Sequence, residues 1–138
     1  MTMQIASISL DQCQRALDAA RAEAEMAGVP SAIVVLDAAG SMKGCIIMDG
    51  APIMAFQIAL DKAYTAVGMG QPTSFWEQVS AESPSFGGAI TSVHRFVPFG
   101  GGVPLKLAGA VFGSVGVSGG TVEQDVQICE AAAAAVTP

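Results

Sequence analysis

The sequence is poor in charged residues. Only 13% of its residues are charged, and six basic residues against twelve acidic ones give a formal net charge of −6. The cations are scattered along the chain, and a phosphate backbone is repelled by net negative charge, so we expect no nucleic-acid partner. Apolar residues make up 51% of the chain. Too few polar groups remain to cover a monomer, which predicts a homo-oligomer, a dimer or higher.

Long apolar runs and a recognisable leader are also absent. No uncharged apolar run approaches the roughly 20 residues that span a bilayer, so we expect no membrane partner. Residues 1–11 have neither a basic start nor a continuous apolar stretch, which predicts no signal peptide and a cytoplasmic location. The chain has 138 residues, with no internal repeat and no linker. It therefore predicts one domain, residues 1–138.

Cysteine is scarce. The three cysteines, Cys13, Cys45 and Cys129, are widely separated and form no C-x-x-C pair. An odd number at this spacing fits neither a disulfide framework nor a zinc site, so we predict buried, reduced thiols and no metal site.

Helix signals are clear at both ends of the chain. Ser9 and Gln12 have the form of a capping box, and apolar residues follow at steps of three and four until Gly28, which predicts a first helix. A second capping box, Thr121 to Gln124, predicts a closing helix. Between them, Pro52 is suited to the first position of a helix that runs to about Val67, and a short helical piece follows at residues 75–81.

Strand signals come in pairs. Short β-branched runs separated by turn residues predict two hairpins, made of residues 31–36 with 42–48 and residues 103–108 with 110–117. The stretch 84–102 is rich in glycine and proline and predicts an irregular loop, extended only at 93–97. The order α-β-β-α-α-β-β-β-α predicts an α+β fold, with helices flanking an antiparallel sheet of about five strands.

Three segments resemble the signatures of a known family. These are MDGAP at residues 48–52 with ALDKAYTA at 59–66, FGGGVPL at 99–105, and GSVGVSGGTVEQD at 113–125. They resemble the GlcG/HbpS-type haem-binding family, which is related to the C-terminal domain of PduO-type corrinoid adenosyltransferases. The resemblance implies a profilin-like antiparallel sheet flanked by helices and assembled as oligomers.

The resemblance also implies a ligand, because some members of the family bind haem through a histidine on the first helix. The predicted first helix of this chain contains no histidine, so that ligand is carried over to no position here. For haem, His94 or a methionine such as Met48 must supply the iron ligand. The cofactor is therefore left unassigned, with haem as one candidate.

His94 is the only histidine of the chain. Because imidazole titrates near neutral pH, His94 is the candidate general acid or base, or the axial ligand of an iron. The alternative is an exposed loop histidine with no special role.

Lys62 lies among apolar residues at helical spacing. A lysine there is expected to be partly buried and paired with an acid such as Asp49 or Asp125. It then either binds a ligand carboxylate, or forms a Schiff base, or makes a purely structural ion pair.

Backbone amides offer a third kind of site. Ser118 and Gly119 precede the closing helix, where amides and the helix dipole hold anions, and Gly101 and Gly102 let backbone approach a ligand. An ordinary turn explains each of these segments as well. Asp49 is a further candidate ligand-binding residue, and its alternative role is structural, to cap the second helix or to close a turn.

The sequence therefore favours an oligomeric small-ligand-binding protein for haem or another flat, carboxylate-bearing molecule. The alternative is an enzyme of small organic acid catabolism, an isomerase, hydratase or hydrolase, that uses His94 and Lys62. A third reading is a catabolic accessory protein that acts in assembly and binds no small ligand.

Overall fold

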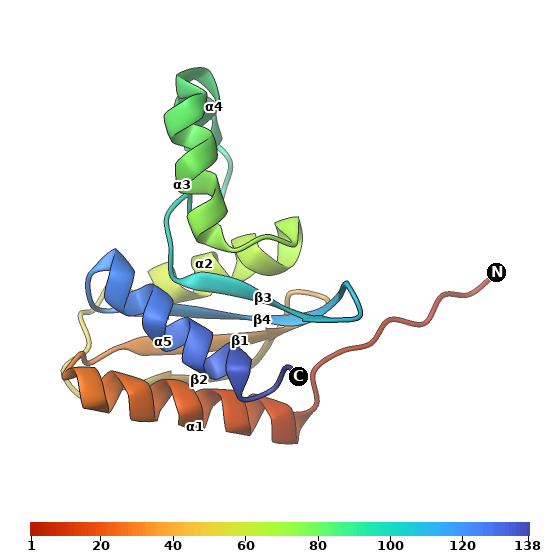
Figure 1. Ribbon diagram of the computed structural model, residues 1–138, viewed down its shortest axis with the longest axis vertical. Helices are drawn as coiled ribbons and strands as arrows, with labels where there is room; N and C mark the ends of the chain where they lie inside the picture. Colours follow the sequence, from red (N-terminus) through yellow and green to blue (C-terminus); the bar gives the residue numbers. More distant parts are fainter.

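The computed structural model describes residues 1–138 as four strands and five helices (Figure 1). The strands form one antiparallel sheet in the order β2-β1-β4-β3. This confirms the expected α+β class. In chain order the elements are α1 (Leu10–Ala27), β1 (Ala32–Asp37), β2 (Met42–Ile47), α2 (Ala55–Met69), α3 (Thr73–Glu82), α4 (Pro84–Ile90), β3 (Gly102–Leu107), β4 (Ala110–Ser118) and α5 (Val122–Ala134).

Helices α1 and α5 begin where the capping boxes predicted. The Ser9 Oγ accepts a hydrogen bond from the Gln12 amide at 3.1 Å, and the Ser9 amide donates to the Gln12 side chain at 2.9 Å. Thr121 and Gln124 repeat this exchange at the start of α5. Gly28 ends α1 with a φ of 68°, a left-handed conformation that glycine adopts without steric cost.

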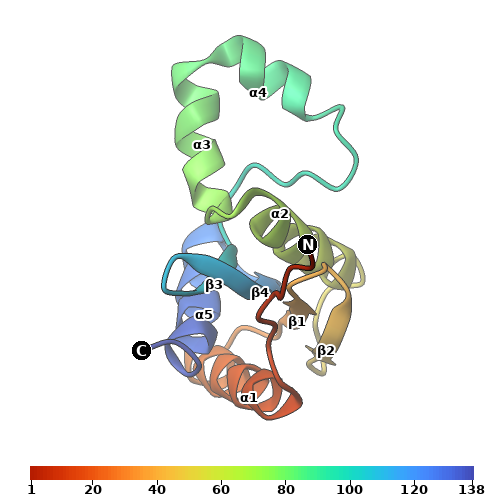
Figure 2. The same ribbon diagram turned by 90° about the vertical axis from the view of Figure 1, so that its right-hand side faces the viewer.

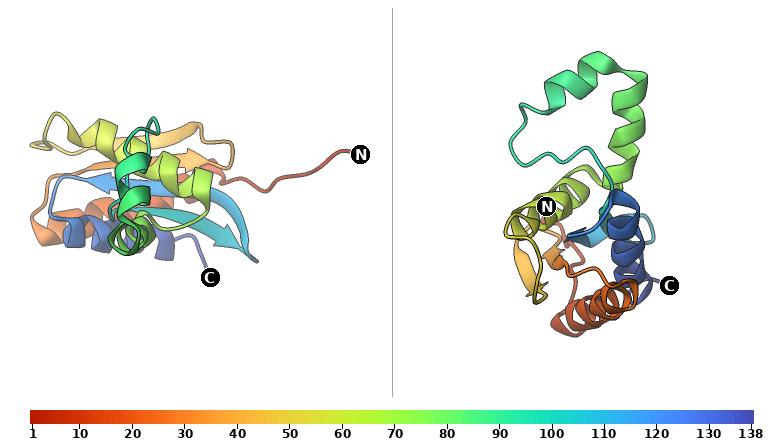
Figure 3. Two further views of the ribbon diagram at one scale, coloured as in Figure 1. Left: turned by 90° about the horizontal axis from the view of Figure 1, so that it is seen from above. Right: turned by 90° about the vertical axis from the view of Figure 1, so that its left-hand side faces the viewer.

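The sheet is covered on both faces, and β1 lies at its centre. Ile33 and Val35 point into the larger core with α1 and α5, whereas Val34 and Leu36 pack against α2 on the other face. Figure 3 shows these layers from above and from the side. Because both faces are buried, β1 has no polar side and its sequence is a continuous apolar run.

Small residues bring α2 close to the sheet. A Cβ added at Gly116 of β4 would collide with the carbonyl oxygen of Ala59, and the Ser114 hydroxyl donates to the Ala63 carbonyl at 2.7 Å. The face of α2 that meets the sheet is therefore largely alanine. Because these residues are small, the backbone of α2 lies closer to the sheet than larger side chains would allow.

The stretch 84–102 differs from its prediction. Residues 84–90 form helix α4, with Pro84 in its first turn, and residues 93–97 are not a strand. The sheet has four strands because residues 93–97 bond to a helix: the Thr65 hydroxyl accepts from the Val97 amide at 3.0 Å. Helix α2 also begins at Ala55 rather than at Pro52, because residues 52–54 form a turn closed by the Ala55 amide and the Pro52 carbonyl.

Residues 73–99 project from the α2 side of the molecule, and we call them the arm (Figures 1 and 2). The arm comprises α3, α4 and the segment that returns to β3. The rings of Phe75, Phe86 and Phe96 contact Trp76 at centroid distances of 4.9, 5.7 and 5.4 Å. This small aromatic cluster holds the arm together apart from the main cores. No helix anywhere in the structure combines the length and apolar character that crossing a membrane requires.

Candidate ligand-binding site

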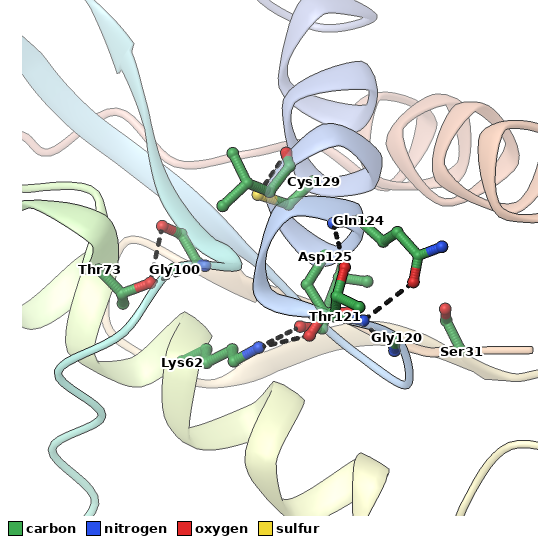
Figure 4. A network of polar contacts seen from close by, with 12 residues as sticks. Ser31, Lys62, Thr73, Gly100, Gly120, Thr121, Gln124, Asp125 and Cys129 are labelled. Atoms are coloured by element: carbon green, nitrogen blue, oxygen red, sulfur yellow. Dashed lines mark hydrogen bonds and ion pairs between the residues drawn. The ribbon is translucent and has the colours of Figure 1, made fainter. Parts of the chain in front are cut away.

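A buried ion pair joins the helices of the two faces at one end of the sheet (Figure 4). The Lys62 ammonium of α2 lies 2.8 Å from Asp125 Oδ2 of α5 and donates to the Val117 carbonyl at 2.9 Å. The Lys62 side chain is 1% exposed. The expectation that Lys62 pairs with an acid is therefore confirmed: of the two acids considered, Asp125 is the partner and Asp49 is not, and the burial is complete rather than partial.

The glycine-rich segments make room for this pair. Gly101 has a φ of 121°, and a Cβ there would lie 2.5 Å from Lys62 Nζ. On the other side, the Gly120 amide donates to Asp125 Oδ1 at 3.0 Å. Gly119 passes so close to the Pro30 carbonyl that a Cβ would collide with it. Backbone at Gly101 and at Gly120 therefore contacts the two members of the ion pair.

The ammonium of Lys62 is fully engaged. Two of its N–H bonds point to oxygens, and the ring of Phe99 lies 5.2 Å from Nζ, within the range of a cation–π contact. Lys62 lines neither of the two largest hollows. The structural ion pair is therefore the role that the contacts support.

His94 lines a separate hollow of about 240 Å³, which we call the His94 hollow. Its walls are mostly apolar and come from α2 and the arm. They are formed by Tyr64, Thr65, Gly68 and Met69 of α2 and by the run 93–96. The His94 side chain is exposed, so an imidazole, an arginine and aromatic rings line one hollow.

Thr65 and Arg95 fix the segment that carries His94. The buried Thr65 hydroxyl lies 3.0 Å from both the Arg95 carbonyl and the Val97 amide. The Arg95 side chain donates to Asp61 at 3.1 Å and stacks on Tyr64, 3.7 Å from the ring centroid. Arg95 also has a φ of 66°, which is rare for a residue with a side chain. The guanidinium is thus held as part of the wall.

Asp49 lies in another place, beside α1. It lines a hollow of about 360 Å³ together with Arg21, Glu25 and residues 46–48. Three of these six residues are charged, and two of the charges are acidic. Met48 has its sulfur 3.4 Å from the Ser31 amide, from which it accepts a hydrogen bond. The Met48 sulfur is therefore already engaged by backbone in this hollow.

The cysteines are only partly as expected. All three are free; Cys13 and Cys129 are buried, but Cys45 on the edge strand β2 is exposed, so its predicted burial is wrong. Burial raises the pKa of the Cys129 thiol to about 12, and Glu130 adds to the shift. Burial also raises the pKa of Cys13, against an opposing effect of Lys43. A buried thiol keeps its proton because the thiolate loses its hydration there.

Comparison with known proteins identifies the family of this chain. The family model described as "Haem degrading protein HbpS-like" matches residues 8–134. The chain belongs to the HbpS-like family. An uncharacterised 15.0 kDa protein of Citrobacter freundii, from the dhaT-dhaS intergenic region, is 39% identical over 132 residues, which are 95% of this chain and 93% of that protein.

Two further relatives of this HbpS-like chain are forms of PduO. The corrinoid adenosyltransferase PduO of Citrobacter freundii is 36% identical over 135 residues, which are 94% of this chain but only 39% of that enzyme. A solved structure described as a PduOC–haem complex superposes with a TM-score of 0.87 at 32% identity, covering 94% of each chain. The relation to PduO that the sequence motifs indicated is therefore confirmed.

Within this family fold, the residues singled out from the sequence lie in three places. Gly101 and Gly102 contact Lys62, and Ser118 and Gly119 follow Val117, whose carbonyl accepts from Lys62. His94 lies in its own hollow, and Asp49 lies beside α1. Sequence reasoning did not select Thr65 or Arg95. The one local signal for Thr65 was that a polar residue stands on a helix face made mostly of alanines. The contacts of Arg95 had no such signal, because they depend on the path of the arm.

Proposed function

We propose that this HbpS-like protein binds haem or another flat, carboxylate-bearing molecule in the His94 hollow. The observation that carries the proposal is that the chain's only histidine and Arg95 line one mainly apolar hollow. The family match supports it, as does the likeness to PduOC, whose structure is described as a haem complex.

The donor set of the His94 hollow fits such a ligand. Imidazole is the commonest protein ligand of haem iron, and a thioether, here Met69, is a known second ligand. Arg95 offers a guanidinium that Asp61 and Tyr64 hold in place, and such a group pairs with a carboxylate. The rings of Tyr64 and Phe96 provide flat apolar walls.

The size of the hollow limits how much of the ligand it encloses. Its volume, about 240 Å³, lies below the roughly 300–1,000 Å³ of sites that enclose drug-sized ligands. In this proposal the hollow therefore holds one edge of the molecule. The homo-oligomer predicted from the composition supplies the remaining cover.

The alternative of a small-acid enzyme has less support. It requires His94 and Lys62 to act on one substrate, but Lys62 is engaged with Val117 and Asp125 and does not line the His94 hollow. A general acid or base needs a hydrogen-bonding path to the substrate. We therefore favour binding over catalysis.

A titration of the purified protein with haem tests the proposal. We expect a saturable Soret band shift, and a loss of at least 10-fold in affinity in His94→Ala because an iron ligand is removed. Arg95→Ala should weaken binding of haem and of metal-free protoporphyrin alike, since it removes a carboxylate partner. Ser92→Ala, an exposed change on the same segment, and Arg15→Ala, an exposed cation on α1, are the matched controls.

Two outcomes contradict the proposal. A wild-type spectrum unchanged at high micromolar haem and protoporphyrin removes the ligand class. Binding that survives unchanged in both His94→Ala and Arg95→Ala places the ligand elsewhere, with the hollow beside Asp49 as the next candidate.

A further inference from the structure

One glycine of helix α2 has no role in the shape of the helix. Gly68 lies within α2, which runs to Met69, and the left-handed cap that ends the helix is Gly70, with a φ of 68°. The φ of Gly68 itself is not in the left-handed range. Its backbone is therefore ordinary helix, where alanine is more favourable than glycine because glycine loses more conformational freedom on folding.

Packing does not explain Gly68 either. Apart from adjacent residues and the backbone of its own helix, no atom lies within 4 Å of a Cβ built there. Glycines that allow close packing differ in this respect. At Gly116, for example, the Ala59 carbonyl lies where the Cβ would be. At Gly68 the chain therefore has lower helix stability, and no other part of the chain uses the space.

The space beside Gly68 belongs to the His94 hollow. The residues of α2 that line this hollow are Tyr64, Thr65, Gly68 and Met69. Because residues three and four apart lie on one face of a helix, a side chain at position 68 would project from the same face as Tyr64 and Thr65. Tyr64 and Met69 are 40% and 50% exposed. Gly68 therefore presents bare backbone to the hollow between two large side chains.

The groups around this bare backbone are flat, and the hollow is small. The Arg95 guanidinium lies 3.7 Å from the centroid of the Tyr64 ring, and Phe96 adds a second ring to the wall. The volume is about 240 Å³, so a folded or branched molecule finds little depth there. A thin ring needs less depth, and backbone at the floor of the hollow accepts it without moving a side chain.

We propose that Gly68 selects the ligands of the His94 hollow by letting a flat conjugated ring lie directly against the backbone of α2. The inference rests on the proposed function and extends it, because it assigns the planar contact to one residue. A side chain at position 68 would occupy the place of the ring. Lower stability at a position that keeps a binding surface open is common in functional sites.

Gly88 provides a matched comparison. It is also a helical glycine, in α4 of the arm, and a Cβ built there has no neighbour within 4 Å. Gly88 does not line the His94 hollow. Open space beside a glycine therefore does not by itself indicate a binding site, and what distinguishes Gly68 from Gly88 is the hollow that it faces.

Substitutions at the two glycines test the inference. Gly68→Ala and Gly68→Leu should each raise the thermal unfolding temperature of the ligand-free protein, because both side chains favour a helix more than glycine does. Both should nevertheless bind metal-free protoporphyrin less tightly, by about 5-fold or more for Gly68→Ala and about 20-fold or more for Gly68→Leu, because the side chain displaces the ring. Gly88→Ala and Gly88→Leu should keep the affinity of wild type.

A bent ring tests the flatness of the contact. N-methylprotoporphyrin has the same carboxylates as protoporphyrin, but the methyl group on its ring nitrogen distorts the plane. Wild type should bind the flat compound about 5-fold or more tightly than the bent one, since a single extra methyl group is discriminated to this degree in a closely fitting site. Gly68→Leu should bind both compounds with similar, low affinity. Equal affinities in wild type overturn the planar contact.

The outcomes separate this inference from the proposed function. If wild type binds neither haem nor protoporphyrin, the proposed function fails and this inference fails with it. If haem binding depends on His94 but is unchanged in Gly68→Leu, this inference alone is overturned. It is overturned equally if the Gly88 variants lose as much affinity. A change in the mass of ligand-free Gly68→Leu in light scattering also overturns it, because position 68 then serves a contact between copies.

Discussion

The two sides of the sheet are built in different ways. On one side, α1 and α5 begin at capping boxes, carry most of the helical charge and cover a core of larger side chains. On the other side, α2 has no side-chain cap and packs through alanines, and the arm leaves the body altogether. The first side is organised by local signals and faces water, whereas the second is organised by close packing and leaves apolar surface uncovered.

The difference bears on function. Every group that we propose for ligand binding lies on the second side, where α2 and the arm meet. Binding surfaces need groups that the fold does not consume, and this side leaves the His94 imidazole and several large apolar side chains exposed. The Lys62–Asp125 pair connects this side to the first.

Breaking the Lys62–Asp125 pair should cause the largest loss of stability. Lys62→Ala or Asp125→Ala leaves one buried charge without its partner, which typically costs about 3–5 kcal/mol in the free energy of unfolding. Chemical denaturation measures it. The double variant Lys62→Met with Asp125→Leu should recover most of the loss, because no buried charge remains. A single variant as stable as wild type contradicts the burial of the pair.

The next largest change in stability is expected where α2 packs against β4. Replacing one glycine there should destabilise the protein, and replacing another should stabilise it. Gly116→Ala forces a Cβ into the Ala59 carbonyl and should destabilise the protein by about 3 kcal/mol or more. Gly68→Ala, in the same helix–sheet unit but with nothing within 4 Å of the added Cβ, should stabilise it by about 0.5–1 kcal/mol. Thermal unfolding measures the stability of each variant against wild type. Equal changes in stability for the two variants would contradict the prediction.

The α5 side should be sensitive to alkaline pH. The Cys129 pKa is about 12 in the folded chain against about 9 in the unfolded one, so the unfolded chain loses its proton first as pH rises. The thiol's contribution is complete below pH 9 and is lost between pH 9 and 12. Each pH unit is worth about 1.4 kcal/mol, so wild type should lose about 2 kcal/mol more than Cys129→Ala from pH 9 to 11.

Denaturant titrations at several pH values provide this comparison. Cys45→Ala is the control because it removes an exposed thiol and should leave the wild-type slope intact. Parallel slopes for wild type and Cys129→Ala contradict the prediction.

The smallest effect concerns the anchor of the arm. Thr65→Val removes the hydroxyl between Arg95 and Val97 and should cost about 1–2 kcal/mol. Hydrogen exchange of the Val97 amide should speed up, while Thr65→Ser, which keeps the hydroxyl, should retain protection. Unchanged exchange in Thr65→Val means that this contact does not hold the arm.

The elements that were predicted well are those with local signals. The capping residues of α1 and α5 and the turns of both hairpins each lie within a few residues of what they define, so the sequence indicates them directly. The predicted strand at 93–97 was wrong because the Val97 amide donates to Thr65 of α2 instead of to a neighbouring strand, and Phe96 packs on Trp76 within the arm. Alternation alone does not distinguish these two environments.

The candidate site was predicted only in part. Asp125 was one of two acids considered as the partner of Lys62. Choosing between them required knowing that the start of α5 lies beside the end of β4, where Lys62 bonds to Val117 and Asp125. His94 was selected because it is the only histidine, but Thr65 and Met69 reach it through a contact between segments about 30 residues apart in the chain.

The sequence by itself determined the capped helices, the two hairpins, the shortage of charge and the family signatures, because each depends on residue types at short spacing. The tertiary structure alone decided that Lys62 is paired with Asp125, that α2 and the arm form a hollow at His94 and Arg95, and that the arm stands apart from the core. The reason is physical: burial and pairing depend on which distant segments the packed chain brings within a few ångströms of one another.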